Sequence, residues 1–429
     1  MKAVNAALSA LLAMISSDIQ AEDFSFDASE YEKKTFEFSG YAEAKQEALN
    51  LQPEKAAYTL NYPDEAPRNW LYRSSGTLDL AGTLNLDTSV VNLHGQAFYA
   101  QDAFISSHDY DKIMDGGIRW SPSSDLSLDI GKRVQRWGKG YAWNPVGFIE
   151  RPKDPSDPQT VREGFNMLSM EWTHTQEGAV RTIMFTPVLV PTYDELNPDF
   201  GKTERLNPAV KLYLLAWDTD IDLMWLAKGA RPQSIGFDFS RNITTNLEVH
   251  GEWAHQYGMT QSYLLPAGAM MQQSRNTDSY LLGIRYLTEH EVTWIAEYYH
   301  NGHGYSASEL DTYYRFLDAA TAPDATAIQL QKARQLQQSG YGKANAGENY
   351  LYLRASVSEP FDWLYTTPAM TLISHLDDNS FQITPEISYT GLPDTEIRAR
   401  AMIFSREPRT EFGEKLSRFR FEIYARYYF

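Results

Sequence analysis

Residues 418–429 read RFRFEIYARYYF, and this stretch decides the fold. Apolar and polar side chains alternate strictly along it. Period-two alternation predicts a β-strand, because successive side chains of a strand point to opposite faces. One face then carries the apolar set, which is Phe419, Phe421, Ile423, Ala425, Tyr427 and Phe429. The other carries Arg418, Arg420, Glu422, Tyr424, Arg426 and Tyr428.

The two ends of the chain suggest where such a strand would be used. A strand ending in Phe429 resembles the signal that the barrel-assembly machinery of bacterial outer membranes reads, although Tyr424 stands where that signal often has glycine. Residues 1–21 are typical of a signal peptide, with basic Lys2, an apolar segment over 6–15 and a cleavage site over 19–21. A soluble β-sandwich strand and a short buried helix are the alternatives. We expect an exported chain in the bacterial outer membrane.

Alternating segments recur through the rest of the chain. They predict an all-β fold, a transmembrane antiparallel up-and-down β-barrel of about eighteen strands spanning 35–429 as one domain, after a periplasmic segment over 22–34. The expected strands begin near residues 36, 78, 91, 113, 126, 165, 179, 208, 221, 234, 245, 277, 291, 349, 367, 379, 393 and 418.

Connection lengths support this interpretation. Short turns, such as 87–88 and 121–124, alternate with mostly longer connections over 46–68, 135–164, 187–207, 257–276 and 302–348. Outer-membrane barrels have short periplasmic turns and long extracellular loops. In the longest loop, Asp324 and Gly340 are expected to bound a short lid helix with an apolar stripe of Ile328, Leu330, Ala333 and Leu336.

Composition excludes several classes of protein. The chain has 429 residues, no cysteine and a formal net charge of −18. A charge of this sign argues against nucleic-acid binding, and the absence of cysteine excludes thiol catalysis and Cys-ligated metals. No catalytic motif stands out, and Glu252 and His255 would lie on opposite faces of one strand. We expect no enzyme activity, no cofactor and no metal.

Charged residues on the polar face of the strands would line the lumen. The candidates are Arg398, Arg400, Arg418, Arg420, Arg426, Glu37, Glu43 and Glu386. They could create a field that selects solutes by charge, or form an ion-pair ladder that closes the barrel. Both interpretations stay open.

The loop over 135–164 is the second candidate. It is rich in aromatic and charged residues, and it could fold inward as a constriction, bind a ligand at the mouth, or only cover the rim. Its candidate residues are Arg133, Arg136, Trp137, Lys139, Tyr141, Trp143, Asp154 and Asp157. Prolines 152, 155 and 158 predict a stiff polyproline II segment.

This loop also carries a resemblance to a known family. Gly131-Lys132-Arg133, followed by Trp137-Gly138 and Asn144-Pro145, resembles the pattern of outer-membrane barrels of the DUF1302 kind. The resemblance implies a porin-like or export-associated barrel.

We therefore expect a channel or export-associated barrel that passes small anionic or amphiphilic solutes through a polar, arginine-lined lumen. A plugged barrel that binds surface polysaccharide or lipid is the alternative, and an outer-membrane enzyme is a third. The expected partners are outer-membrane lipid and lipopolysaccharide, the barrel-assembly machinery, and a periplasmic or inner-membrane transport partner.

Overall fold

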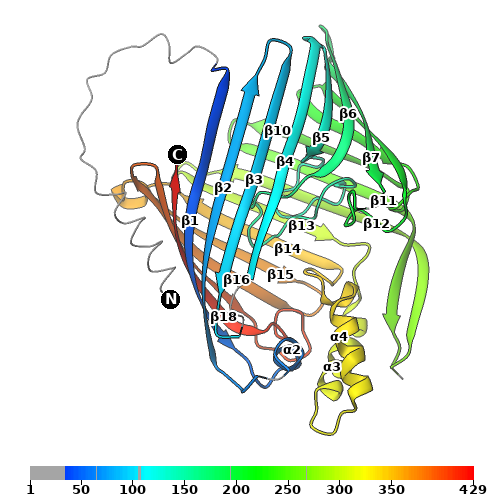
Figure 1. The fold of residues 1–429 in the computed structure, drawn as a ribbon, viewed down its shortest axis with the longest axis vertical. Coiled ribbons are helices and arrows are strands. Elements are labelled where there is room, and N and C mark those ends of the chain that lie inside the picture. Colours follow the sequence, from blue (N-terminus) through cyan, green and yellow to red (C-terminus); the bar gives the residue numbers. More distant parts are fainter. Residues whose placement is uncertain (1–33, 64, 105–107, 194, 267) are drawn as a thin grey trace.

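The chain forms a closed β-barrel of eighteen strands, in which each strand is antiparallel to its neighbours (Figure 1). The computed structural model describes residues 34–63, 65–104, 108–193, 195–266 and 268–429. The expected signal peptide over 1–21 and the segment over 22–33 lie outside the described residues. The predicted fold class and strand number are confirmed.

The strands follow one another around the barrel in chain order. Their bounds are β1 Phe36–Leu51, β2 Trp70–Asn85, β3 Ser89–Gln101, β4 His108–Ser123, β5 Leu126–Arg133, β6 Phe165–Thr175, β7 Val180–Thr192, β8 Arg205–Ala216, β9 Thr219–Leu226, β10 Ser234–Thr244, β11 Leu247–Leu264, β12 Met270–Leu287, β13 Val292–His300, β14 Asn349–Val357, β15 Thr366–His375, β16 Ser380–Leu392, β17 Thr395–Phe404 and β18 Ser417–Tyr428.

The first and last strands close the barrel. The register of β1 and β18 places Glu43 opposite Arg426, and the ladder runs from Tyr41 to Leu51 along β1. Phe429 continues this pairing, because its backbone exchanges hydrogen bonds with Gly40 at 2.9 and 3.0 Å. A Cβ on Gly40 would lie 2.3 Å from the Asp79 carbonyl oxygen, so only glycine fits at this close approach.

The wall turns its apolar side chains outward. Leu282 on β12 and Ile130 on β5 are 58% and 59% exposed, and Phe421 and Ile423 on β18 are also exposed. The inward positions of the same strands carry polar groups, such as the buried Glu422. Among the described residues, no helix has both the length and the apolar character needed to cross a membrane.

The connections are sorted by length between the two ends of the barrel. One end has the turns, most of which are short, and the other has the connections over 52–69, 134–164, 193–204, 301–348 and 405–416. This agrees with the predicted alternation. The predicted loop over 257–276 is wrong, however, because β11 and β12 continue through it as a long hairpin. Its polar sequence hides this, since a hairpin that projects beyond the barrel needs no apolar face.

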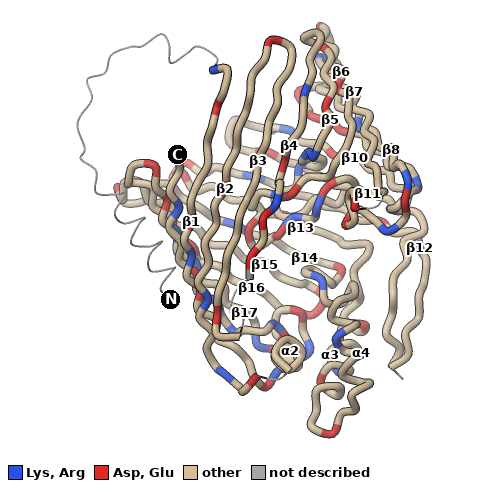
Figure 2. Tube along the Cα trace, viewed as in Figure 1, with Lys and Arg blue, Asp and Glu red and all other residues tan. Residues whose placement is uncertain are grey.

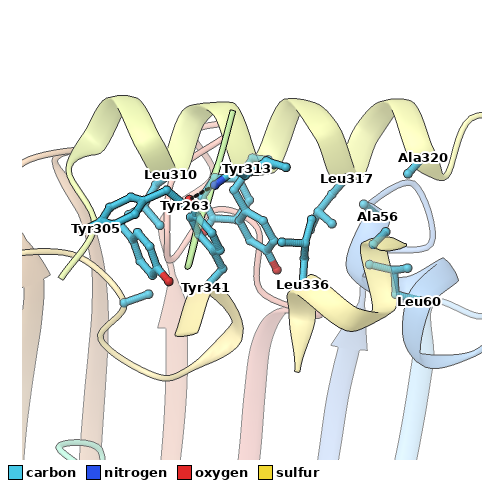
Figure 3. Close-up of a cluster of buried hydrophobic side chains, with 14 residues drawn as sticks. Ala56, Leu60, Tyr263, Tyr305, Leu310, Tyr313, Leu317, Ala320, Leu336 and Tyr341 are labelled. Carbon is cyan, nitrogen blue, oxygen red and sulfur yellow. Dashed lines mark hydrogen bonds between the residues drawn. The ribbon is translucent and has the colours of Figure 1, made fainter. Parts of the chain in front are cut away.

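Three helices pack together at the loop end: α2 (Ala56–Asn61), α3 (Ala307–Ala320) and α4 (Ala327–Gln337). Their shared core joins the end of β11 and includes a stack of Tyr305, Tyr341 and Tyr313 (Figure 3). The sequence does predict a lid helix here, and it packs on neighbouring loops as expected.

The predicted bounds of that helix are wrong. Thr326, not Asp324, caps α4, because Thr326 and Gln329 complete a reciprocal capping box. The helix ends at Gln337, and Gly340 begins a separate 3-10 turn. Ala333 and Leu336 are buried, whereas Ile328 is 78% exposed and does not belong to the buried stripe.

Candidate functional site

The connection between β5 and β6, residues 134–164, folds into the barrel; we call it the inner loop. Its apolar side chains pack on inward-facing residues of the wall. The buried members are Trp137, Ala142, Trp143, Val146, Phe148 and Ile149. Figure 1 shows the segment in blue-green between the front and back walls. Its contacts reach from β6 on one side to β17 on the other, so the loop crosses the lumen.

Two buried carboxylates of the wall hold the middle of the inner loop. Glu252 on β11 accepts hydrogen bonds from the backbone N–H groups of Gly140 at 2.6 Å and Val146 at 3.3 Å. Glu297 on β13 accepts from the N–H groups of Tyr141 and Ala142. An ionised acceptor strengthens each of these bonds. We call Glu252 and Glu297 the carboxylate clamp.

The clamp also explains the Trp-Gly pair of the sequence. Gly138 has φ +96°, and a Cβ there would lie 2.6 Å from the Glu252 carboxylate. A left-handed backbone conformation and the close approach of a wall residue both require glycine at this position.

Lysines of the inner loop add ionic contacts to the clamp. Lys139 lies 2.9 Å from Asp222 and 3.9 Å from Asp238, which are buried on β9 and β10. Burial favours a lower pKa for Lys139, but the Asp222 carboxylate outweighs it and the pKa is raised. Lys153 donates to the Gly140 carbonyl inside the loop, and burial lowers the pKa of Lys153.

The last part of the inner loop contacts the opposite wall. Asp157 pairs with Arg400 on β17 at 3.1 Å, and Ser156 lies within hydrogen-bond distance of Gln382 on β16. The predicted polyproline II segment is wrong. Consecutive turns replace it, with hydrogen bonds from Asp157 N to Asp154 O and from Thr160 N to Asp157 O. Asp154 also accepts from Ser156 N–H, which favours a turn over an extended helix.

Each of the five candidate arginines has a carboxylate partner. Arg400 also lies 2.6 Å from Glu422, and Arg398 lies 3.0 Å from Glu396 and 3.8 Å from Glu386. Three pairs join β18 to β1 or to the connection after it: Arg420 with Glu47, Arg426 with Glu43, and Arg418 with Glu54. We call these three pairs the seam ladder. In Figure 2, blue segments follow the wall where β18 meets β1.

The candidate carboxylates are not all in one place. Glu43 belongs to the seam ladder, and Glu386 lies between Arg354 and Arg398 at 3.1 and 3.8 Å. Glu37 is separate, because it accepts from the Asn85 amide near the turn end and has no arginine partner among the described residues.

The remaining candidates of the inner loop have different surroundings. Arg133 ends β5 and pairs with Asp115 and Asp129 in the wall. Trp137 and Trp143 are buried, and Trp143 stacks on Tyr299 at 5.1 Å. Arg136 is exposed, and Tyr141 faces the cavity described next.

A cavity of about 570 Å³ lies between the inner loop and the wall. Its charged lining has four basic residues, Lys139, Arg285, Arg354 and Arg398, with two carboxylates, Glu248 and Glu386, and His250. Tyr141, Gln159 and wall hydroxyls complete a polar surface. The cavity therefore combines a basic excess with hydrogen-bonding groups.

The sequence reasoning missed the clamp and its neighbours. Glu252, Glu297, Asp222 and Asp238 sit at inward parity on their strands, as many polar residues do. Alternation alone would have placed them in the lumen, but it could not identify the backbone groups that they bind. Glu252 and His255 do lie on opposite sides of β11, because Glu252 is buried within and His255 pairs with Asp278 near the rim.

The strand pairing and the inward loop define a closed eighteen-stranded barrel with a crossed lumen. Two solved structures to which the chain is similar are bacterial porins or carry such a title. The first is a triple mutant of the Rhodopseudomonas blastica porin, at 9% identity and a TM-score of 0.43, covering 92% of this chain and 100% of that one. The other is Pseudomonas aeruginosa OccK11 (OpdR), at 11% identity and 0.49, covering 91% and 95%.

No protein-family profile matches the sequence, and no curated protein matches it. The resemblance to the DUF1302 kind of barrel therefore stays a prediction. The fold assignment rests on the strand pairing itself.

Proposed function

We propose that this chain is a non-enzymatic channel of the bacterial outer membrane, in which small anionic or amphiphilic solutes pass a constriction built by the inner loop. The exposed apolar wall supports the location, because a closed wall with outward leucine and isoleucine is stable in lipid and not in water. The observation that carries the proposal is the charged cavity between the inner loop and the wall.

The charges around the cavity favour anions. Arg354 and Arg398 share one carboxylate, Glu386, so the pair keeps a net positive charge. Arg285 is exposed, and no carboxylate lies within 4 Å of its guanidinium among the described residues. Fixed basic groups in a narrow polar passage raise the local concentration of anions.

Planar-bilayer recording tests this proposal. We expect channels whose reversal potential in a salt gradient indicates anion preference. The double variant Arg285→Gln/Arg398→Gln should weaken that preference, and Arg418→Gln, outside the cavity, should change it little. An unchanged or strengthened anion preference in the double variant would contradict the proposed selectivity.

A plugged barrel is the second candidate, and the carboxylate clamp favours it. A loop that crosses the lumen and is held by buried carboxylates could close the passage. A barrel that inserts but conducts no ions, and that retains glycan or lipid through purification, would replace the channel by this binding function. Lipopolysaccharide, the assembly machinery and a transport partner remain predicted partners.

A further inference from the structure

The connection between β14 and β15, residues 358–365, differs from every other connection at the turn end. It is longer than they are, and it reads SEPFDWLY. Four consecutive or nearly consecutive large side chains are exposed: Phe361 at 87%, Trp363 at 55%, Leu364 at 62% and Tyr365 at 55%. We call residues 358–365 the aromatic turn. In Figure 1 it is the short orange coil at the left.

Internal hydrogen bonds hold the aromatic turn in one conformation. Trp363 N–H donates to the Pro360 carbonyl at 3.1 Å, and Tyr365 N–H donates to the Glu359 carboxylate at 2.7 Å. Phe361 has φ +56° and Tyr365 has φ +59°, which are uncommon for large residues. A backbone that accepts this strain displays its side chains in a fixed arrangement, as binding segments often do.

The aromatic turn lies against the outside of the barrel. The Tyr365 ring is 2.9 Å from the position that a Cβ would take on Gly391, beside the Tyr389 side chain. Tyr389 belongs to the outward set of β16 with Ile387, and Met370 faces outward on the neighbouring strand β15. The exposed apolar surface of the turn is therefore continuous with the apolar wall.

We propose that the aromatic turn inserts its side chains into the lipid leaflet at the turn end and anchors the barrel there. Tryptophan and tyrosine favour the boundary between headgroups and acyl chains, since one part of each ring system is apolar and the other polar. The turn has two carboxylates, Glu359 and Asp362, and no basic residue, so it fits zwitterionic phospholipid rather than an anionic surface. This inference rests on the proposed membrane location.

Site-specific fluorescence can test the anchor cleanly, because the chain has no cysteine. Trp363→Cys, labelled with the environment-sensitive dye NBD, is placed in phosphatidylcholine nanodiscs as the full-length barrel. We expect blue-shifted emission, quenching by a lipid-borne nitroxide, and protection from iodide in the water. Leu364→Cys provides a second label position if the first variant folds poorly.

Two controls separate this inference from the proposed location. Leu282→Cys on the outer wall must report lipid if the barrel spans a membrane. Glu177→Cys, in the exposed turn between β6 and β7, should report water. A lipid signal at Leu282 with water-like emission and full iodide quenching at residues 363 and 364 would overturn the anchor alone. A water signal at Leu282 would overturn the membrane location, and the anchor with it.

Discussion

The carboxylate clamp and the seam ladder use the same residue types in opposite ways. In the clamp, Glu252 and Glu297 are almost completely buried and accept hydrogen bonds from backbone N–H groups of the inner loop. In the seam ladder, arginines pair with glutamates between strands that backbone hydrogen bonds already join. The arginines remain partly exposed, at 23% for Arg426 and 46% for Arg418.

This difference indicates what each region contributes. A buried carboxylate that loses its bonds, or a buried N–H that loses its acceptor, costs about 1–3 kcal/mol for each group. An exposed ion pair contributes about 0–1 kcal/mol. The clamp should therefore determine whether the inner loop stays in place, whereas the seam ladder should contribute mainly charge to the lumen.

The largest effect is expected from breaking the clamp. Glu252→Ala/Glu297→Ala leaves the N–H groups of residues 140, 141, 142 and 146 without their acceptors, at about 1–3 kcal/mol for each. The inner loop should then leave its place while the barrel stays folded. We expect a higher single-channel conductance and new tryptic cleavage at Lys139 in the folded barrel.

Glu37→Ala/Glu54→Ala is the matched control for this prediction. It also removes two inward or rim carboxylates, but neither contacts the inner loop, since Glu37 accepts from Asn85 and Glu54 pairs with Arg418. Conductance and cleavage should match those of the unaltered chain. Equal conductance in both double variants would mean that the clamp does not hold a constriction.

The same contrast explains what the sequence could predict. Alternation in residues 418–429 gives the strand, its parity and its position at the seam, because period two is a local property of the chain. It also places Arg426 and Glu43 on the lumen side. The clamp is different, since Glu252 and Tyr141 are far apart in the chain and only the folded loop brings backbone N–H groups to the carboxylates.

Local polarity misled the sequence reasoning where the chain leaves the wall. The hairpin of β11 and β12 projects as a paired ribbon, so the polar stretch after Tyr257 gives no sign of a strand. Proline spacing in 152–158 suggested an extended segment, but Asp154 and Ser156 form local hydrogen bonds that stabilise turns. Side-chain to backbone bonds of this kind compete with regular structure.

A smaller effect is expected at Arg400, which connects the two regions. Its side chain is 11% exposed and lies between Asp157 of the inner loop and Glu422 of β18. Arg400→Gln removes one positive charge from the lumen and leaves Asp157 without its partner on the wall. We expect the anion-to-cation permeability ratio to fall by up to about tenfold, which corresponds to about 1.4 kcal/mol.

Reversal potentials in a salt gradient measure this ratio. Arg418→Gln is the comparison, because it removes the same charge at the exposed rim, where salt screens it. A fall as large in Arg418→Gln as in Arg400→Gln would show that overall charge, and not the position beside the inner loop, sets the selectivity.

The smallest effect is expected at the seam itself. Arg426→Gln loses the 2.7 Å pair with Glu43 and the contact of the guanidinium with the Tyr41 ring at 4.3 Å. The backbone ladder of β1 and β18 remains, so the free energy of unfolding should fall by only about 1 kcal/mol. Urea unfolding in lipid vesicles at low and high salt measures this, and the difference between variant and parent should shrink as salt rises. Arg426→Lys keeps the charge but not the planar fork, so it should lie between the two. A loss well above 1 kcal/mol that does not depend on salt would mean that this pair is part of what closes the barrel, as the clamp is part of what holds the loop.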